Sequence, residues 1–532
     1  MAVMSLGVLL VAVLPAHSPA ALDSVPLYTD LGSYHRAVTT KNPDAQHYFD
    51  QGLRLVYGFN HAEAIRAFTE ATRLDPKCGM CYWGIAYAYG PHVNAGMDSA
   101  SGVAAYAAAQ KAKSLSGGAS PVEKGYINAV VKRYAKVPPA DRARLDSAYA
   151  TAMCEVSTRF ADDLDAGALC AEAKMDLRPW NYWKMPSGEP YPGTTELVAK
   201  LESVIQRNPN HPGACHFYIH AVEAVAPEKA VPCAERLAAL MPGAGHMVHM
   251  PAHIYIRVGR YNEAVESNVH AVHTDETFVE GQKPQGVYPL AYYPHNLHFL
   301  SFAATMAGRS GEALDAARTL HAKTNLEVAR VVPMIQTFVP FQVLTLVNFG
   351  RWEEVLAQPL PPSDLPYALL MAHYARGVAF AATGKGAEAA AELESVKKVG
   401  ATVRPDDKPV ADIAMHALMG EIAQRSGKLD EAAAHYKAAI AVEDAGLYFE
   451  PPTWYYPIRH SLGLVLLRQG QASSAEAVYR EDLKRFPENG WALFGLMEAL
   501  RMQGKDEEAA AVDKRFRAAW KDADVTLTAS RF

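Results

Sequence analysis

The chain lacks an excess of charge of either sign, since its 532 residues hold 51 Lys and Arg against 57 Asp and Glu, a net charge of −6. This balance gives no support for a nucleic-acid partner, which would favour a basic surface. The sequence contains no nucleotide-phosphate loop, no G-x-S-x-G motif and no H-E-x-x-H motif. Long alternating runs of β-branched residues are missing, whereas alanine is abundant. The composition therefore favours helices. The sequence also lacks the most familiar catalytic motifs.

Long apolar runs are missing too. The most apolar stretch, residues 5–14, is too short to span a bilayer. Ser18 and Ala20 follow it at the small-residue spacing of a signal-peptide cleavage site, although no Lys or Arg precedes the run. We therefore expect residues 1–20 to be a signal peptide. The mature chain should contain no membrane span, and the protein should be periplasmic or secreted. A disordered apolar tail is the alternative.

Cysteine is scarce, and its residues are paired in the sequence. The six cysteines fall into three pairs, which are Cys78/Cys81, Cys154/Cys170 and Cys215/Cys233. Export would permit disulfides. Cys215 and Cys233 are expected on consecutive antiparallel helices, at a distance that a bridge can span. For Cys78 and Cys81 three interpretations stay open: an inert disulfide, a redox couple or a soft-metal pair.

The feature that the sequence does contain is an internal repeat. Residues 45–76 read AQHYFDQGLRLVYGFNHAEAIRAFTEATRLDP, with small and aromatic residues at the consensus positions of a repeat of about 34 residues: Gly52, Ala64, Phe68, Ala71 and Pro76. The frame recurs about ten times, for example in VGRYNEAVESNVHAV and SGKLDEAAAHYKAAI. The chain thus resembles the tetratricopeptide repeat (TPR) proteins. The resemblance implies an all-α, right-handed superhelical solenoid of helix-turn-helix repeats, whose first helices line a concave groove.

The repeat frame predicts four segments after the signal peptide. They are N-terminal repeats (residues 45–116), an irregular helical insert with an aromatic loop (117–193), histidine-bearing repeats with the candidate metal site (194–325) and C-terminal repeats (326–524). The loop, PWNYWKMPSGEPYPG, is too rich in proline, glycine and aromatic residues to form a helix. It could cover the groove as a lid, stack on a substrate or plug the core.

Histidine gathers on one face of the predicted groove. Consensus residues place the starts of three repeats at Pro212, Gly245 and Pro294. In proteins that resemble this one, positions 2, 5, 9 and 12 of the first helix face the ligand, and positions 2, 5 and 9 of the three repeats make nine places. Seven of them hold histidine, namely His216, His220, His246, His249, His253, His295 and His298. Because histidine makes up 20 of 532 residues, chance predicts fewer than one.

This histidine stripe predicts a metal centre. Neutral imidazole is the commonest protein ligand for first-row metals, and first helices packed about 10 Å apart can aim their imidazoles at one point. An imidazole-dominated set suits copper, with zinc or iron as the alternative. Glu223, at position 12, is the candidate catalytic residue as a general base; metal ligation and orientation of the imidazoles are its alternative roles. Pro251, between His249 and His253, should kink the helix and re-aim a side chain.

Three functions follow from this pattern. The first is an exported, copper-favoured oxidoreductase that acts on a small-molecule or peptide substrate in the groove. The others are a peptide-binding scaffold without catalysis and a metal storage or delivery protein. The segments DLRPW, YIHAVE, GAGHMVHMPAHIYIRVGRY and YYPHNLHFL resemble a histidine-rich group of bacterial TPR proteins. This second resemblance supports the fold and implies no particular reaction, so the sequence leaves open whether the protein is an enzyme and which oligomer it forms.

Overall fold

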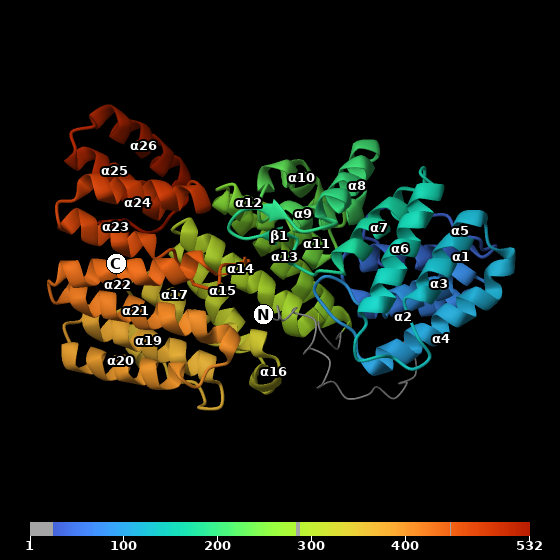
Figure 1. Ribbon diagram of the computed structural model, residues 1–532, viewed down its shortest axis with the longest axis horizontal. Helices are drawn as coiled ribbons and strands as arrows, with labels where there is room; N and C mark the ends of the chain where they lie inside the picture. The colour runs from blue at the N-terminus through green and yellow to red at the C-terminus, as the bar shows by residue number, and fades with distance from the viewer. Residues whose placement is uncertain (1–24, 283–287, 447) are drawn as a thin grey trace. The chain divides into compact units, whose positions relative to one another are not determined.

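The structure, a computed structural model, describes residues 25–282, 288–446 and 448–532 (Figure 1). The predicted signal peptide, residues 1–20, lies outside them. The described residues form the α-helices α1 to α26, the short 3-10 or π turns η1 to η5 and one two-stranded sheet. This arrangement, in which helices alternate with short turns, confirms the predicted all-α repeat fold.

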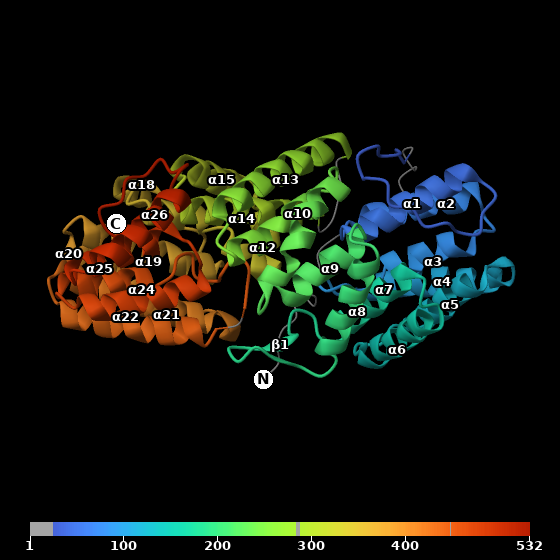
Figure 2. The same cartoon turned by 90° about the horizontal axis from the view of Figure 1, so that it is seen from above.

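Two compact units make up the described chain. The first unit is Met1–Ile254 with His270–Pro289, and the second unit is Tyr255–Val269 with Leu290–Phe532, each as far as it is described. The division falls inside the predicted histidine-bearing segment. Both units are built from antiparallel helix pairs, such as α1 and α2 in the first and α21 and α22 in the second (Figure 2).

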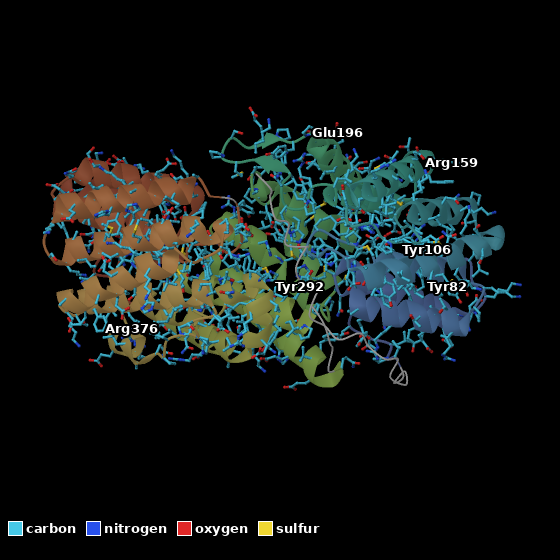
Figure 3. All side chains as sticks on the ribbon, turned by 60° about the horizontal axis from the view of Figure 1, so that its bottom comes forward. Tyr82, Tyr106, Arg159, Glu196, Tyr292 and Arg376 are labelled. Atoms are coloured by element: carbon cyan, nitrogen blue, oxygen red, sulfur yellow. A yellow bond between two sulfur atoms is a disulfide. The ribbon has the colours of Figure 1, made fainter. Side chains whose placement is uncertain are left out.

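The first unit holds the N-terminal pairs, the insert and the first histidine-bearing helices. Its helices are α1 (Pro43–Tyr57), α2 (His61–Leu74), α3 (Gly79–Ala88), α4 (Ser99–Leu115), η1 (Ser116–Gly118), α5 (Pro121–Lys132), α6 (Ala143–Arg159), α7 (Leu164–Met175), α8 (Thr194–Arg207), α9 (Pro212–Val222), η2 (Pro227–Ala230), α10 (Val231–Leu240) and α11 (Gly245–His249). Charged side chains such as Arg159 on α6 and Glu196 on α8 are exposed at its surface (Figure 3).

The second unit continues the helix pairs. Helices α12 (Pro251–Arg257) and α13 (Tyr261–Gln282) and the π turn η3 (Tyr288–Tyr292) have residues in both units. The helices of the second unit alone are α14 (Tyr293–Met306), α15 (Ser310–Lys323), α16 (Leu326–Val331), η4 (Pro333–Thr337), α17 (Phe341–Asn348), α18 (Trp352–Ala357), α19 (Pro366–Ala382), α20 (Gly386–Gly400), η5 (Pro405–Asp407), α21 (Lys408–Arg425), α22 (Leu429–Asp444), α23 (Arg459–Arg468), α24 (Ala472–Arg485), α25 (Gly490–Met502) and α26 (Asp506–Ala519).

Helices approach one another closely because an aromatic ring of one helix lies on glycines of its neighbours. The Phe68 ring on α2 lies so near Gly52 on α1 and Gly84 on α3 that a Cβ atom there would come within 2.6 and 2.5 Å of it. In the second unit, Tyr479 on α24 packs in the same way on Gly495 of α25. The consensus glycine of the repeat thus sets the distance between neighbouring helices.

We expect Gly495→Ala to lower the free energy of unfolding by about 1–3 kcal/mol, because the added methyl group overlaps the Tyr479 ring and a packed core absorbs extra volume poorly. Urea denaturation measures the change. Gly386→Ala is the control, since a methyl group at this position of α20 would meet nothing within 4 Å. The control should be neutral or slightly stabilising; equal losses in the two variants would contradict the close packing.

The aromatic loop of the insert is not helical, as predicted. Strands β1 (Trp183–Lys184) and β2 (Glu189–Pro190) pair antiparallel within it. The indole nitrogen of Trp183 donates a hydrogen bond of 2.7 Å to the carbonyl oxygen of Ala221 on α9. The loop therefore packs on the helix that carries two of the predicted metal ligands.

Two of the three cysteine pairs are disulfides. They join Cys78 to Cys81 and Cys154 to Cys170. The interpretation of the first pair as a soft-metal site is therefore wrong, because bonded sulfur atoms are not available as thiolate ligands. Cys215 and Cys233 are buried thiols whose sulfur atoms lie 2.6 Å apart, on α9 and α10.

The contact between Cys215 and Cys233 predicts a third disulfide under oxidising conditions, since its sulfur atoms approach the bonded distance of about 2.05 Å. We expect protein oxidised before denaturation to contain no titratable thiol, and Cys215→Ser to release the one of Cys233. Thiol titration in denaturant without reductant measures both. Two thiols in the oxidised unmodified protein would refute this bridge.

Candidate metal centre

Helix α9 carries the first two predicted ligands. It begins at Pro212, the predicted repeat start, and its N-cap residue His211 accepts a hydrogen bond from the Ala214 amide through Nδ1 (3.1 Å). His216 and His220 are four residues apart, so both rings leave the same face of the helix. Both side chains belong to buried residues, with 0% and 3% of their surface exposed.

The next predicted ligands stand at a break between two short helices. Helix α11 begins at Gly245, also as predicted, and ends at His249, whereas α12 begins at Pro251. Proline has no amide hydrogen to continue the first helix, but it fits the first turn of the next one. The predicted kink thus coincides with an interruption of the helix at Met250, which keeps helical dihedral angles. His246, His249 and His253 are all buried around it.

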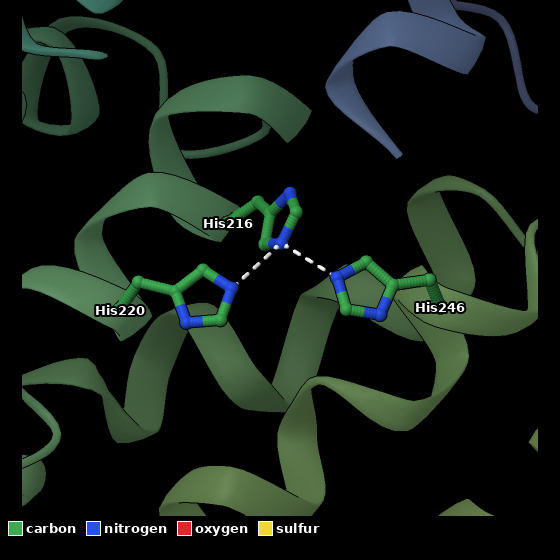
Figure 4. A group of neighbouring side chains, drawn as sticks. All are labelled: His216, His220 and His246. Carbon is green, nitrogen blue, oxygen red and sulfur yellow. Dashed lines mark hydrogen bonds between the residues drawn. The ribbon is translucent and has the colours of Figure 1, made fainter. Parts of the chain in front are cut away.

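Three imidazoles from these elements converge on one point (Figure 4). The Nε2 atom of His216 lies 3.2 Å from Nε2 of His220 and 3.1 Å from Nε2 of His246. Figure 4 shows the three rings pointing toward one another, two from neighbouring turns of α9 and the third, His246, from α11. Their ligand atoms are close enough together to hold a metal ion.

The hydrogen-bond partner of His216 fixes its tautomer. Its Nδ1 atom lies 2.6 Å from the carbonyl oxygen of Tyr57, which can only accept, so Nδ1 carries the proton. In neutral His216, Nε2 therefore presents a lone pair to two neighbouring nitrogen atoms. One lone pair accepts one well-aligned N–H group, whereas a metal ion can bind all three nitrogens at once.

Glu223 connects this group to another histidine. Its Oε1 atom lies 3.5 Å from Nδ1 of His220, and its Oε2 atom lies 2.9 Å from Nδ1 of His253. A carboxylate only accepts hydrogen bonds, so its position near both Nδ1 atoms favours the tautomers with the proton on Nδ1, in which each Nε2 is an electron-pair donor. This placement favours the orienting role among the three that the sequence left open. Ligation is the second role, because His220, Glu223 and His253 also lie close enough to hold an ion.

A further pair of imidazoles adjoins the first group. Nε2 of His253 lies 2.9 Å from Nε2 of His249. The His253 ring also meets the His220 ring edge to face, with 5.5 Å between centroids. Five of the seven predicted ligands, together with Glu223, therefore lie side by side in the first unit.

His295 and His298 lie on α14 of the second unit, which begins one residue before the predicted repeat start. Within this unit, the His295 ring packs against Phe299 at 5.0 Å and the His298 ring packs against Phe341 at 4.2 Å. Burial lowers the pKa of His298 to about 3. The membership of these two histidines in the metal centre stays a prediction.

Burial lowers the pKa of three imidazoles of the centre, those of His216, His220 and His246. It holds the pKa of His216 and of His246 well below the usual value, and the neighbouring imidazoles add to this effect. Burial also lowers the pKa of His220, although Glu223 opposes it. For Glu223 burial acts in the other direction, but His253 and His220 outweigh it and lower the pKa to about 2. The lowered pKa values of His216, His220 and His246 favour neutral rings at these three positions, and neutral imidazole is the form that binds metals.

The nitrogen spacings fit coordination of a metal ion. With metal–nitrogen bonds of about 2.0–2.1 Å, two ligands of a tetrahedral ion lie about 3.3 Å apart, and two ligands at a right angle lie about 2.9 Å apart. The two Nε2 contacts of His216, at 3.1 and 3.2 Å, approach the first value. The contact between His249 and His253, at 2.9 Å, equals the second.

Aromatic residues enclose the imidazoles, and sequence reasoning missed Phe59 and His92 among them. Phe59, in the turn between α1 and α2, contacts His216 with ring centroids 4.4 Å apart and stacks on His92 at 4.5 Å. Trp180 of the aromatic loop meets His220 edge to face at 5.0 Å. Phe59 and Trp180 have φ angles of +56° and +62°, which bulky residues rarely adopt. Backbone strain of this kind gathers at functional sites.

Comparison with known proteins supports the repeat and gives no reaction. Residues 460–524 match the family model TPR_16, described as tetratricopeptide repeat, so the chain carries repeats of this type. No curated protein matches the chain. The resemblance to a histidine-rich bacterial group stays a prediction.

Three solved helical structures resemble parts of this chain in the path of their backbone. A human IFIT1 dimer with m7Gppp-AAAA is 12% identical, with 91% of each chain covered and a TM-score of 0.31. A Rap protein complexed with competence and sporulation factor is 10% identical, with 71% of this chain and 93% of the other covered and a TM-score of 0.38. Naa15/Naa10 bound to HypK-THB is 14% identical, with 91% and 72% covered and a TM-score of 0.23. Scores this low carry no conclusion about function.

Among the described residues, none of the helices combines the length and the apolar character that a membrane crossing requires.

Proposed function

We propose that the protein is an exported metalloprotein whose polyhistidine centre, in the first unit, performs copper-dependent oxidoreductase chemistry. One observation carries this proposal: Nε2 of His216, with its proton held on Nδ1 by Tyr57, faces Nε2 of His220 and of His246 at 3.2 and 3.1 Å. Three buried nitrogen donors at this spacing form half or more of the coordination sphere of a first-row metal.

Copper is favoured because imidazole dominates the set, and zinc or iron is the alternative. Bound copper would supply one-electron exchange with a substrate or activation of dioxygen. The chain's own residues prepare the site. Glu223 holds protons on Nδ1 of His220 and His253 and thereby aims their Nε2 atoms. Phe59 and Trp180 cover His216 and His220 with apolar rings that exclude water.

Metal analysis of protein purified from its native host tests this proposal. We expect roughly one to two metal ions per chain by elemental mass spectrometry. If the metal is copper(II), its electron paramagnetic resonance spectrum should carry hyperfine splitting from several imidazole nitrogens. Protein that is isolated without metal, and that then binds neither added copper nor added zinc, would overturn the proposal.

A peptide-binding scaffold is the second candidate. It is favoured by the match of residues 460–524 to the tetratricopeptide repeat, since solenoids of this kind present extended binding surfaces. Metal-free protein that still binds a peptide with unchanged affinity would support this function over the first.

Metal storage or delivery is the third candidate, and it shares the histidine centre with the first. The rate of metal exchange separates the two. A cargo ion should leave to a chelator within minutes, whereas a resident catalytic ion behind buried ligands should persist for hours.

A further inference from the structure

The segment after α26 folds back onto the second unit. The indole nitrogen of Trp520 donates a hydrogen bond of 2.7 Å to the Val525 carbonyl oxygen, which turns the chain. The Asp524 carboxylate then accepts hydrogen bonds from the amides of Ser310 and Gly311, at 2.7 and 2.9 Å, at the start of α15. These contacts anchor the segment before its last residues.

Ser530 and Arg531 are buried by side chains of the second unit. The Ser530 hydroxyl lies 2.6 Å from the Tyr479 hydroxyl and donates to the His460 carbonyl oxygen at 3.0 Å. Arg531, only 8% exposed, donates from Nη1 to Oδ1 of Asn348 at 2.6 Å.

The guanidinium of Arg531 is held between polar and aromatic partners. It lies 3.9 Å from the centroid of the Tyr456 ring, and its Nη2 donates to the Tyr455 hydroxyl at 3.3 Å. A cation over an aromatic ring in a buried position is a strong and directional contact. The contacts of Arg531 therefore depend on the charge of its guanidinium, on its planar shape and on its hydrogen-bond donors.

Phe532 completes the set of contacts. Its ring meets the Trp491 ring edge to face with centroids 5.6 Å apart, and its carbonyl oxygen accepts a hydrogen bond of 3.0 Å from Nη2 of Arg425. By contrast, Thr526 and Thr528 are exposed. The segment thus combines exposed threonines with the buried residues Leu527, Ser530 and Arg531, as a peptide on a binding surface does.

The partners of the segment lie on several helices of the second unit. Asn348 ends α17, Arg425 ends α21, His460 lies on α23 and Trp491 lies on α25. These four helices are the first helices of their pairs, and first helices line the inner face in stacked repeats of this kind. One short segment therefore contacts the first helices of four pairs, and also Tyr479 on the second helix α24.

We propose that the inner face of the second unit is a binding site for an extended peptide with an arginine followed by an aromatic residue, and that residues 526–532 occupy it in cis. A free peptide must then compete with the chain's own segment. The proposal does not depend on the metal centre, whose five clustered histidines lie in the first unit.

The test uses the full chain with a protease site inserted between Val525 and Thr526, cut after folding. The probe is a fluorescent peptide of the sequence TLTASRF, residues 526–532. We expect the cut protein to bind this peptide by fluorescence polarisation and the uncut protein to bind it at least about tenfold more weakly. The peptide TLTASAF should compete about tenfold or more less well, the usual cost of removing a hydrogen-bonded charged group.

A second variant guards against slow release of the cut segment. Arg531→Ala in the uncut chain should weaken the cis contact and allow the labelled peptide to bind, whereas Thr528→Ala, which changes an exposed side chain, should not. If the cut chain and the Arg531→Ala chain both keep their helical circular dichroism and neither binds the peptide, the segment is a structural plug and the proposal is wrong.

Discussion

Replacement of His216 by Ala is expected to remove the bound metal from the first unit. Nε2 of this residue is the common neighbour of Nε2 of His220 and of His246, so its loss leaves two nitrogen donors with nothing between them. Replacing an outer partner of a metal ligand usually costs about 10–100-fold in affinity, and removal of an inner ligand should cost more. Competition with a chelator of known affinity measures the change.

The control is the double variant His416→Ala and His435→Ala. These two residues form a close histidine pair in the second unit, with Nδ1 atoms 3.3 Å apart, and no third ligand joins them among the described residues. Metal content should fall in His216→Ala and stay unchanged in the double variant. An equal loss in both variants would indicate non-specific binding to surface histidines, and an unchanged affinity in His216→Ala would refute the centre.

Replacement of Glu223 by Gln should weaken metal binding by about 10–100-fold while leaving the number of ions unchanged at saturation. The amide keeps the size of the side chain, but its NH2 group cannot accept the hydrogen bond from Nδ1 of His220 or of His253. One of the two rings then loses its orienting partner. Chelator competition measures the affinity, and elemental analysis measures the count.

This experiment also separates the three roles of Glu223. An orienting residue changes the affinity and keeps the count, whereas a direct ligand changes the coordination spectrum of the bound ion. A general base would leave both unchanged and reduce only turnover. Glu196→Gln, at an exposed position of α8 in the same unit, controls for the loss of one negative charge.

The sequence predicted the parts of the site that depend on repeat register. Because consensus residues fix where each first helix begins, the starts at Pro212 and Gly245 were correct to the residue. The face of His216, His220 and His246 follows from these starts and from helical geometry. The break at Pro251 follows from the missing amide hydrogen.

Other parts of the site depend on long-range contacts that no repeat position encodes. Phe59 lies in a turn more than 150 residues before His216, and its ring meets the imidazoles only because α1 and α9 pack together. The same holds for the proton that the Tyr57 carbonyl holds on His216. The state of the cysteines was open as well, because spacing alone does not distinguish a disulfide from a pair of ligands.

Tyr57, the last residue of α1, and Phe59, in the turn that follows, couple the centre to the N-terminal helix pair. The carbonyl oxygen of Tyr57 accepts a hydrogen bond from His216, and the Phe59 ring packs on the same imidazole. An ion bound to the His216 ring would therefore stabilise the N-terminal helix pair as well. Because the ion binds only the folded protein, a higher occupancy would raise the melting temperature. At a free metal concentration of 100 times the dissociation constant, this linkage amounts to about 2.7 kcal/mol.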